Sequence, residues 1–202
     1  MFEAVVRRIG RVGSDNRVSL DEFGNLSVSK GLPDYARLAA AGRLYAVDTH
    51  AGTAKAPVVA APTTSPEWGL YNASADEVLV VLEAACTIKS GPQGLGLALL
   101  GAAAIGPQTA VSADYASSAK SCLDGSQRNS DFWITNNPTL VGGTPAWHVL
   151  ANDPGNLIAS INIGSGLVAK VDGKLVARPN GGMVAFEVVG PTGTAALFSV
   201  SF

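Results

Sequence analysis

Charged residues are scarce in this chain. Asp, Glu, Lys and Arg make up 15% of its 202 residues, whereas soluble globular domains average about 25%. A surface so poor in charge is weakly solvated, and contact with other subunits is one way to cover it. A monomer with a surface of Ser, Thr, Asn and Gly is the alternative. The formal net charge is only −2, so no global field attracts nucleic acid.

Cysteine and histidine are also rare, with two of each. Cys86 and Cys122 do not have the spacing of a metal or redox motif, so two buried free thiols are expected, with a disulfide as the alternative. Neither His50 nor His148 lies at ligand spacing from a second His or Cys. We therefore expect no metal site, and we interpret His148 as a packed or surface residue.

Motifs for the common chemistries are missing too. The chain has no G-x-S-x-G frame of a serine hydrolase and no phosphate-binding glycine loop. For the acidic pairs Asp21-Glu22 and Asp76-Glu77 the sequence pattern indicates no second acid that would lie opposite them. The sequence therefore gives no support for the two catalytic carboxylates of a glycosidase. Asp114, Asp124 and Asp131 could bind Ca²⁺, but a plain surface loop is the simpler interpretation. We expect neither an enzyme nor a bound cofactor.

Long hydrophobic runs are absent. The most apolar stretch, GLGLALLGAAAIG at 94–106, is too short and too rich in glycine to span a bilayer. The N-terminal MFEAVVRRIG lacks the apolar core of a secretion signal. We therefore expect no membrane partner and synthesis in a cytoplasm, without secretion.

The N-terminal segment 1–43 differs from the rest of the chain. It holds seven of the fourteen Lys and Arg residues, which suggests an arm that touches an acidic partner or is simply solvated. Alternating apolar residues on both sides of a turn at 21–25 predict a β-hairpin over 18–28. Pro33, Asp34 and the following Ala and Leu residues predict a helix over 33–41 that Gly42 ends.

Residues 44–202 show the pattern of an all-β domain. Short apolar runs separated by Gly and Pro turns are typical of a sandwich or barrel. The expected strands lie at 43–49, 67–72, 77–90, 96–104, 146–150, 156–163, 181–190 and 194–202. Asp172-Gly173 predicts a further hairpin, with strands at 167–171 and 174–179. The two prolines of 56–64 predict an edge strand or an extended connector.

The many short strands favour jelly-roll topology. The predicted fold is thus an all-β, jelly-roll-like β-sandwich over 44–202. The arm of residues 1–43, with its hairpin and one short helix, precedes it.

Three features give the chain a family resemblance: APVVAAPTTSPEWGLYN at 56–72, the long apolar strand at 77–90, and Pro154-Gly155 before the last strands. They resemble a loose group of small β-sandwich virion proteins of tailed bacteriophages. The resemblance covers about residues 43–202. It implies a jelly-roll-like fold, homo-oligomers that are often trimers, and a place on the capsid as a cement or decoration protein. It carries no catalytic residues.

From this resemblance we expect a structural virion protein that binds its own copies and the major capsid protein. Trp133, interpreted as the one aromatic on a polar loop, is a candidate partner contact because exposed aromatics mark interfaces. Arg7, Arg8 and Arg11 in the arm are further candidate contacts. The alternative function is a receptor- or glycan-binding head on a phage spike or fibre, with Trp133 as its anchor.

Overall fold

The structure is a computed structural model of the whole chain. It describes residues 4–6, 16–18, 34–49, 54–91, 96–109, 120–126, 131–153, 166–191 and 196–202. Several sequence-based expectations lie outside these residues. They are the turn at 21–25, the strand at 156–163, His50, Asp114 and the three arginines Arg7, Arg8 and Arg11.

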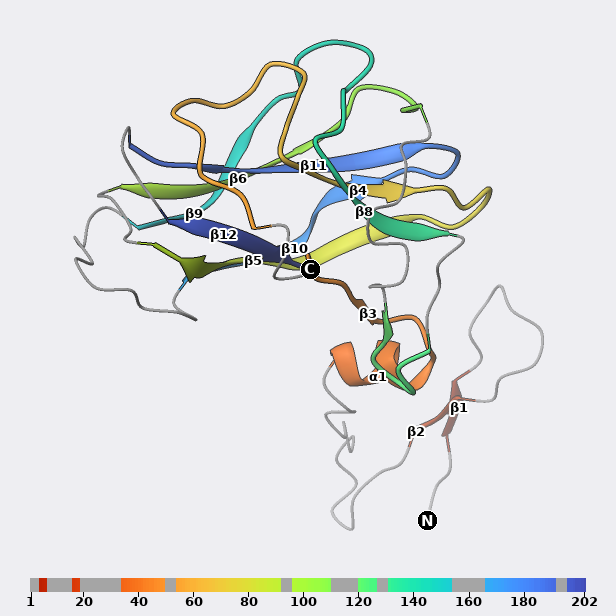
Figure 1. The fold of residues 1–202 in the computed structure, drawn as a ribbon. Coiled ribbons are helices and arrows are strands. Elements are labelled where there is room, and N and C mark those ends of the chain that lie inside the picture. Colours follow the sequence, from red (N-terminus) through yellow and green to blue (C-terminus); the bar gives the residue numbers. More distant parts are fainter. Residues whose placement is uncertain are drawn as a thin grey trace.

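Two antiparallel sheets pack face to face and form a β-sandwich (Figure 1). The three-stranded sheet has the order β10 (Gly166–Ala177), β5 (Leu79–Ser90), β12 (Leu197–Ser201). The five-stranded sheet has the order β8 (Phe132–Asn136), β4 (Trp68–Asn72), β11 (Gly182–Val189), β6 (Leu97–Ala103), β9 (His148–Asp153). The predicted all-β sandwich is therefore confirmed.

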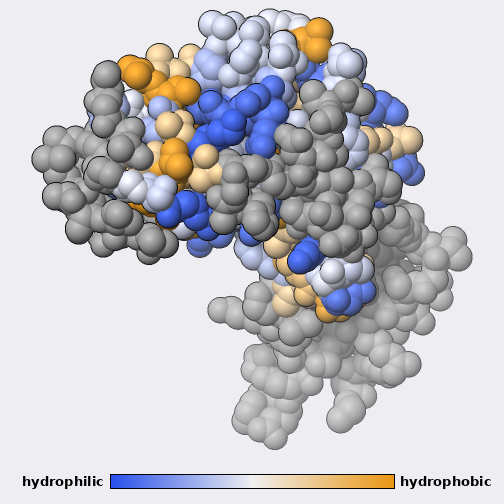
Figure 2. Space-filling view, viewed as in Figure 1, coloured by the Kyte–Doolittle hydropathy of each residue, from blue (hydrophilic) through white to orange (hydrophobic). Residues whose placement is uncertain are grey.

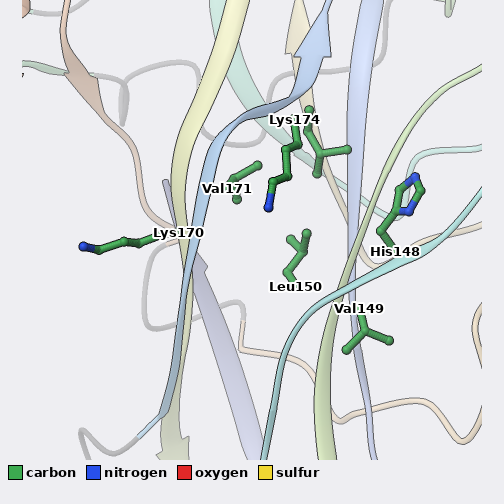
Figure 3. A pocket seen from close by; sticks show the side chains of 7 residues that line it. His148, Val149, Leu150, Lys170, Val171 and Lys174 are labelled. Atoms are coloured by element: carbon green, nitrogen blue, oxygen red, sulfur yellow. The ribbon is translucent and has the colours of Figure 1, made fainter.

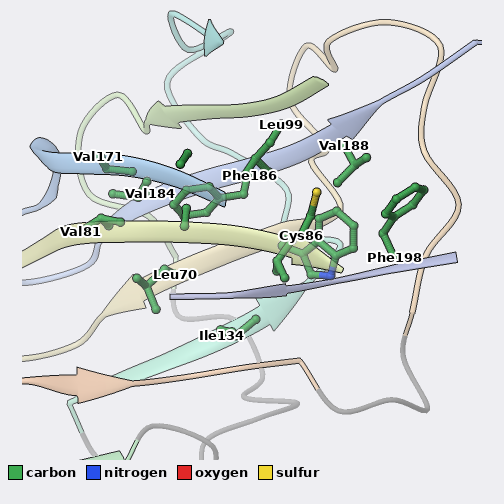
Figure 4. Packing of buried hydrophobic residues seen from close by; sticks show 14 of the residues in the cluster. Leu70, Val81, Cys86, Leu99, Ile134, Val171, Val184, Phe186, Val188 and Phe198 are labelled. Carbon is green, nitrogen blue, oxygen red and sulfur yellow. The ribbon is translucent and has the colours of Figure 1, made fainter. Parts of the chain in front are cut away.

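The main core fills the space between the two sheets (Figure 4). Side chains alternate along each strand, so every second residue points inward. On β4 the inward residues are Trp68 and Leu70, as the sequence pattern predicts. Phe186 of β11 is fully buried, and its ring centroid lies 4.2 Å from that of Phe202. This packing holds the C-terminal end of the chain against the five-stranded sheet.

A second, smaller core covers the outer face of the five-stranded sheet. Tyr71, Met183 and Ala185 point away from the main core and pack with Leu140. The loop before β4 (orange) and the loop after β8 (teal) lie over this face in Figure 1. Trp147 belongs to this layer, and its indole Nε1 donates a hydrogen bond of 2.8 Å to the Pro62 carbonyl. The outer face of strands β4 and β11 is therefore buried, which alternation alone does not predict.

The segment before β4 joins the sheets without forming a long strand. Val47 exchanges backbone hydrogen bonds with Phe202, and Lys55 does so with Phe198. Val58 then forms a parallel bridge to Val189 at the end of β11. The expected extended connector at 56–64 is thus confirmed. Upstream of it, residues 47–49 and Lys55 lie along the free side of β12.

The helix of the described residues is α1 (Asp34–Ala40), close to the predicted range. It ends as predicted at Gly42, whose φ is 64°. The amide of Gly42 donates to the Ala39 carbonyl and that of Arg43 to the Leu38 carbonyl, the hydrogen-bond pair of a Schellman motif. No helix in the described residues is long and apolar enough to span a bilayer.

Two small sheets complete the description. β1 (Ala4–Val6) pairs with β2 (Asn16–Val18), so the paired strands of the arm lie upstream of the predicted turn. β3 (Tyr45–Ala46) pairs with β7 (Lys120–Ser121). Tyr35 of α1 lies within reach of β10, its hydroxyl 3.5 Å from a carboxylate oxygen of Asp172.

The hairpin predicted at Asp172-Gly173 is wrong. Both residues have positive φ, 50° and 77°, as the dipeptide suggests. However, the residues on both sides pair with the same strand, β5. Residues 171–174 stand opposite the single residue Leu82, so they form a large bulge within β10 rather than a turn between two strands.

Asn72, the last residue of β4, ties the two sheets together. It is fully buried. Its Nδ2 donates to the carbonyls of Glu77, just before β5, and Ala177, the last residue of β10. Its Oδ1 accepts from the Ser74 amide. The Asn of the motif that carries the family resemblance therefore has a structural role, because it satisfies three buried backbone groups.

Candidate functional site

Trp133 lies on strand β8, not on the polar loop that we expected. Its ring centroid is 4.9 Å from that of Tyr71, and it packs half-buried against the second core. Its indole Nε1 is buried and meets no acceptor in the described part of the chain. We expected a loop because the sequence on both sides of FWITN is polar. Residues 132–136 instead form a strand that pairs with β4.

The other candidate side chains are dispersed. His148 is exposed at the start of β9. Asp124 is exposed in a turn, where hydrogen bonds from the Ser126 side chain and amide lower the pKa of its carboxyl. Among the described residues no three His, Cys, Asp or Glu side chains come together as metal ligands. The pair Asp76-Glu77 lies in a turn, where the Ser74 hydroxyl accepts from the Glu77 amide.

The cysteines differ in environment. Cys86 is buried in the main core and Cys122 is exposed, and neither forms a disulfide. The expectation that both thiols are buried is therefore wrong for Cys122. Burial raises the pKa of Cys86 to about 11. Because the thiolate is the reactive form, Cys86 is chemically inert near neutral pH.

Sequence analysis missed a buried carboxylate, Glu187. It lies on β11 between Phe186 and Val188 and is fully buried. Its side chain accepts hydrogen bonds from two backbone amides, from Glu67 at 2.9 Å and from Val188 at 3.1 Å. Alternation places Glu187 on the outer face of the sheet, and only the covering loops bury it. The isolated Glu in the apolar run VAFEVV is the one signal in the sequence.

Burial decides the protonation of Glu187. Loss of water, with a contribution from the nearby Glu67 carboxylate, raises the pKa of Glu187 to about 7, against the lowering effect of the two amides. Lys55 lies 3.5 Å from a Glu67 oxygen and donates to the Asn137 side chain. Glu187 therefore anchors the connector before β4 and can hold a proton near neutral pH.

A cleft of about 360 Å³ opens where the edge strands of the two sheets meet, β9 and β10 (Figure 3). Leu150, Val171 and Leu175 form its apolar part. In Figure 3 the Lys174 side chain and His148 lie on one side of β10, whereas the amino group of Lys170 extends to the other side. Lys174 therefore brings one positive charge to the cleft.

The most distinctive surface is the outer face of the three-stranded sheet, which is the lower layer in Figure 1. We call it the valine face, defined as Val80, Glu83 and Ala85 of β5 with Val168, Lys170 and Val176 of β10. In the register of the two strands Val176 is opposite Val80, Lys170 opposite Glu83 and Val168 opposite Ala85. Val168 is 64% exposed and Val80 45%.

Within the described residues Val80 and Val168 of the valine face stay exposed, whereas loops cover the central strands of the five-stranded sheet. By contrast, the side of the molecule in Figure 2 carries apolar residues in small groups between hydrophilic ones. Scattered apolar residues are normal on a soluble surface. A sheet face with exposed valines on both sides of a charge pair is more informative, because apolar surface of this kind is commonly buried by a partner.

No protein family, curated protein or solved structure matches the chain.

Proposed function

We propose that the chain is a structural subunit of a bacteriophage virion. In this role it decorates the capsid as a cement protein, associates with its own copies and binds the lattice of the major capsid protein. The uncovered valine face carries the proposal, because a subunit built for assembly needs surface that its own fold leaves free. The low content of charged residues adds to this argument, because a surface with few charges is weakly solvated and is suited to contact with other subunits.

The order of the strands supports a jelly roll as the form of the sandwich. A jelly roll can be described as a long antiparallel hairpin wrapped so that successive strand pairs fall in alternate sheets. Here Asp48 and Lys55 form bridges to β12 in the smaller sheet, and β4 pairs with β11 in the larger one. Next come β5 with β10 in the smaller sheet and β6 with β9 in the larger. Strand β8 is an addition beside β4.

This likeness of fold adds to the proposal only as an analogy, because jelly rolls serve several functions. The alternative, a receptor- or glycan-binding head, depended on an exposed Trp133. Since Trp133 packs against Tyr71 and is half-buried, it offers a sugar less of its ring than the exposed loop residue that the alternative assumed. The geometry therefore favours the decoration role.

Sedimentation with capsids tests the proposal. Shells assembled from the coat protein of the virus that encodes this chain are mixed with the purified protein and pelleted. We expect the protein to pellet with the shells up to a fixed saturating ratio and to raise the temperature at which the shells come apart. Shells of an unrelated phage serve as the control. Protein that stays in the supernatant at every concentration would refute the decoration role.

A further inference from the structure

Burial shows how the valine face is oriented. Val81 and Ala84 of β5, with Leu175 and Ala169 opposite them, are buried in the main core. Val80, Glu83, Val168 and Lys170 are exposed, because the bulge of β10 shifts the register between the two pairs. Figure 3 agrees, since Lys170 extends to the side of β10 opposite the cleft. The exposed valines and the two charges thus share one surface.

Glu83 and Lys170 give this surface a charge pattern. They are directly opposite each other in the strand register and both are exposed. Among the ion pairs of the described residues, Glu83 and Lys170 do not occur. Each charge therefore remains available for a group outside the chain, while the valines around the two charges supply apolar contact.

We propose that the valine face binds the valine face of a second copy of the chain around a two-fold axis. In a two-fold contact the same patch serves both copies, so it must complement itself. Lys170 of each copy then faces the partner's Glu83, and the valines of the two sheets pack together. Two sheets stacked in this way lie about 10 Å apart.

The size of the face sets the strength of this contact. The face runs from Val80 to Ala85 on β5, so it covers roughly 20 Å by 10 Å, or about 200 Å². Stable interfaces bury about 800 Å² on each partner. The pair is therefore expected to be weak and to form at micromolar concentrations or above. The inference rests on the proposed function, since it names the surface for its self-association.

Charge reversal provides the decisive test. In Glu83→Lys both copies present only lysines at the contact, and in Lys170→Glu only glutamates. We expect sedimentation equilibrium to show a wild-type dimer and to show its dissociation constant raised at least about tenfold in each single variant. The double variant Glu83→Lys/Lys170→Glu restores opposite charges and should bring the constant back close to the wild-type value.

Two matched controls separate the contact from general effects. Val168→Ser should weaken the dimer, whereas Val149→Ser should not, because both valines are 64% exposed but Val149 lies on β9. Lys174→Glu reverses a charge on the other side of β10 and should leave the dimer unchanged. Unfolding temperatures measured at dilute concentration verify that every variant is folded.

The outcomes distinguish this inference from the proposed function. A monomer at all concentrations, or single reversals that leave the dimer intact, would overturn the two-fold contact. A trimer insensitive to these substitutions would also overturn it, while supporting the oligomer expected of a decoration protein. A dimer that responds as described but ignores capsids would support the contact and refute the decoration role.

Discussion

Glu187 makes the stability of the fold depend on pH. Its pKa is about 7 in the folded protein, against 4.5 for the free group. Between these values the folded chain holds a proton that the unfolded chain has lost. The free energy of unfolding therefore falls as the pH rises from about 4.5 to 7, by up to about 3 kcal/mol, and levels off above.

The variant Glu187→Gln should remove this dependence. Glutamine has a similar shape and no charge, so the free energy of unfolding of the variant should vary less between pH 5 and 8 than that of the wild type. Urea unfolding at a series of pH values measures the difference. If the free energy of unfolding changed with pH equally in the variant and the wild type, Glu187 would be ionised in the folded state. Glu83→Gln, at an exposed site, is the control and should keep the wild-type slope.

The same residue marks a limit of sequence-based prediction. The strand expected at 181–190 is present, with Phe186 in the main core and Glu187 on the outer face of the sheet. What alternation cannot give is the cover over the outer face, which comes from loops that lie far from β11 in the sequence. Burial of a residue on a sheet thus depends on contacts that local pattern does not contain.

At the scale of an element, β10 depends on the conformation of its bulge. Gly173 has a φ of 77° and lies near Val80, 3.3 Å from the position that an added Cβ would take. Gly173→Ala should therefore lower the free energy of unfolding by about 1 kcal/mol, because L-residues are disfavoured in this region. Chemical denaturation measures the effect. An unchanged stability would mean that the bulge adopts another conformation.

The neighbouring residue offers a matched control. Asp172 also has positive φ, 50°, and asparagine tolerates this region as well as aspartate does. Asp172→Asn should therefore change stability by less than about 0.5 kcal/mol. A large loss in this variant would point to a role of the carboxylate charge instead of the backbone.

The bulge also explains why elements were easier to predict than their pairing. Asp172-Gly173 correctly predicts two residues with positive φ, because that is a local property of the dipeptide. Which strand the flanking residues join is set by the whole sheet, and both flanks join β5. The helix at 34–40 and its end at Gly42 were predicted well since their signals are local. The valine face needed the register of β5 and β10, which no local signal supplies.

At the scale of the molecule, the sandwich and the arm are expected to have different tasks. The strands of both sheets belong to residues after 43, and the arm 1–43 carries half of the basic residues. Deleting residues 1–43 should leave a folded, self-associating protein that no longer coats shells, because the arm is expected to reach the capsid or a neighbour. Circular dichroism and the shell assay measure folding and coating, and full coating by the shortened chain would refute this role.

A second variant separates charge from length. Replacing Arg7, Arg8 and Arg11 by serine keeps the arm but removes three positive charges. If the arm contacts an acidic surface, this variant should bind shells more weakly, and its binding should depend less on salt. Unchanged binding and salt dependence would assign the role of the arm to its other residues.

The bulge of residues 171–174 has one more consequence, for copies held at high local concentration. β10 is an edge strand, and an uninterrupted edge of twelve residues would be a template on which neighbouring chains could add strand after strand into fibres. A foreign strand that docked beside β10 would lose its ladder where the bulge begins. The subunit can thus be crowded on a surface without becoming a seed for amyloid-like growth.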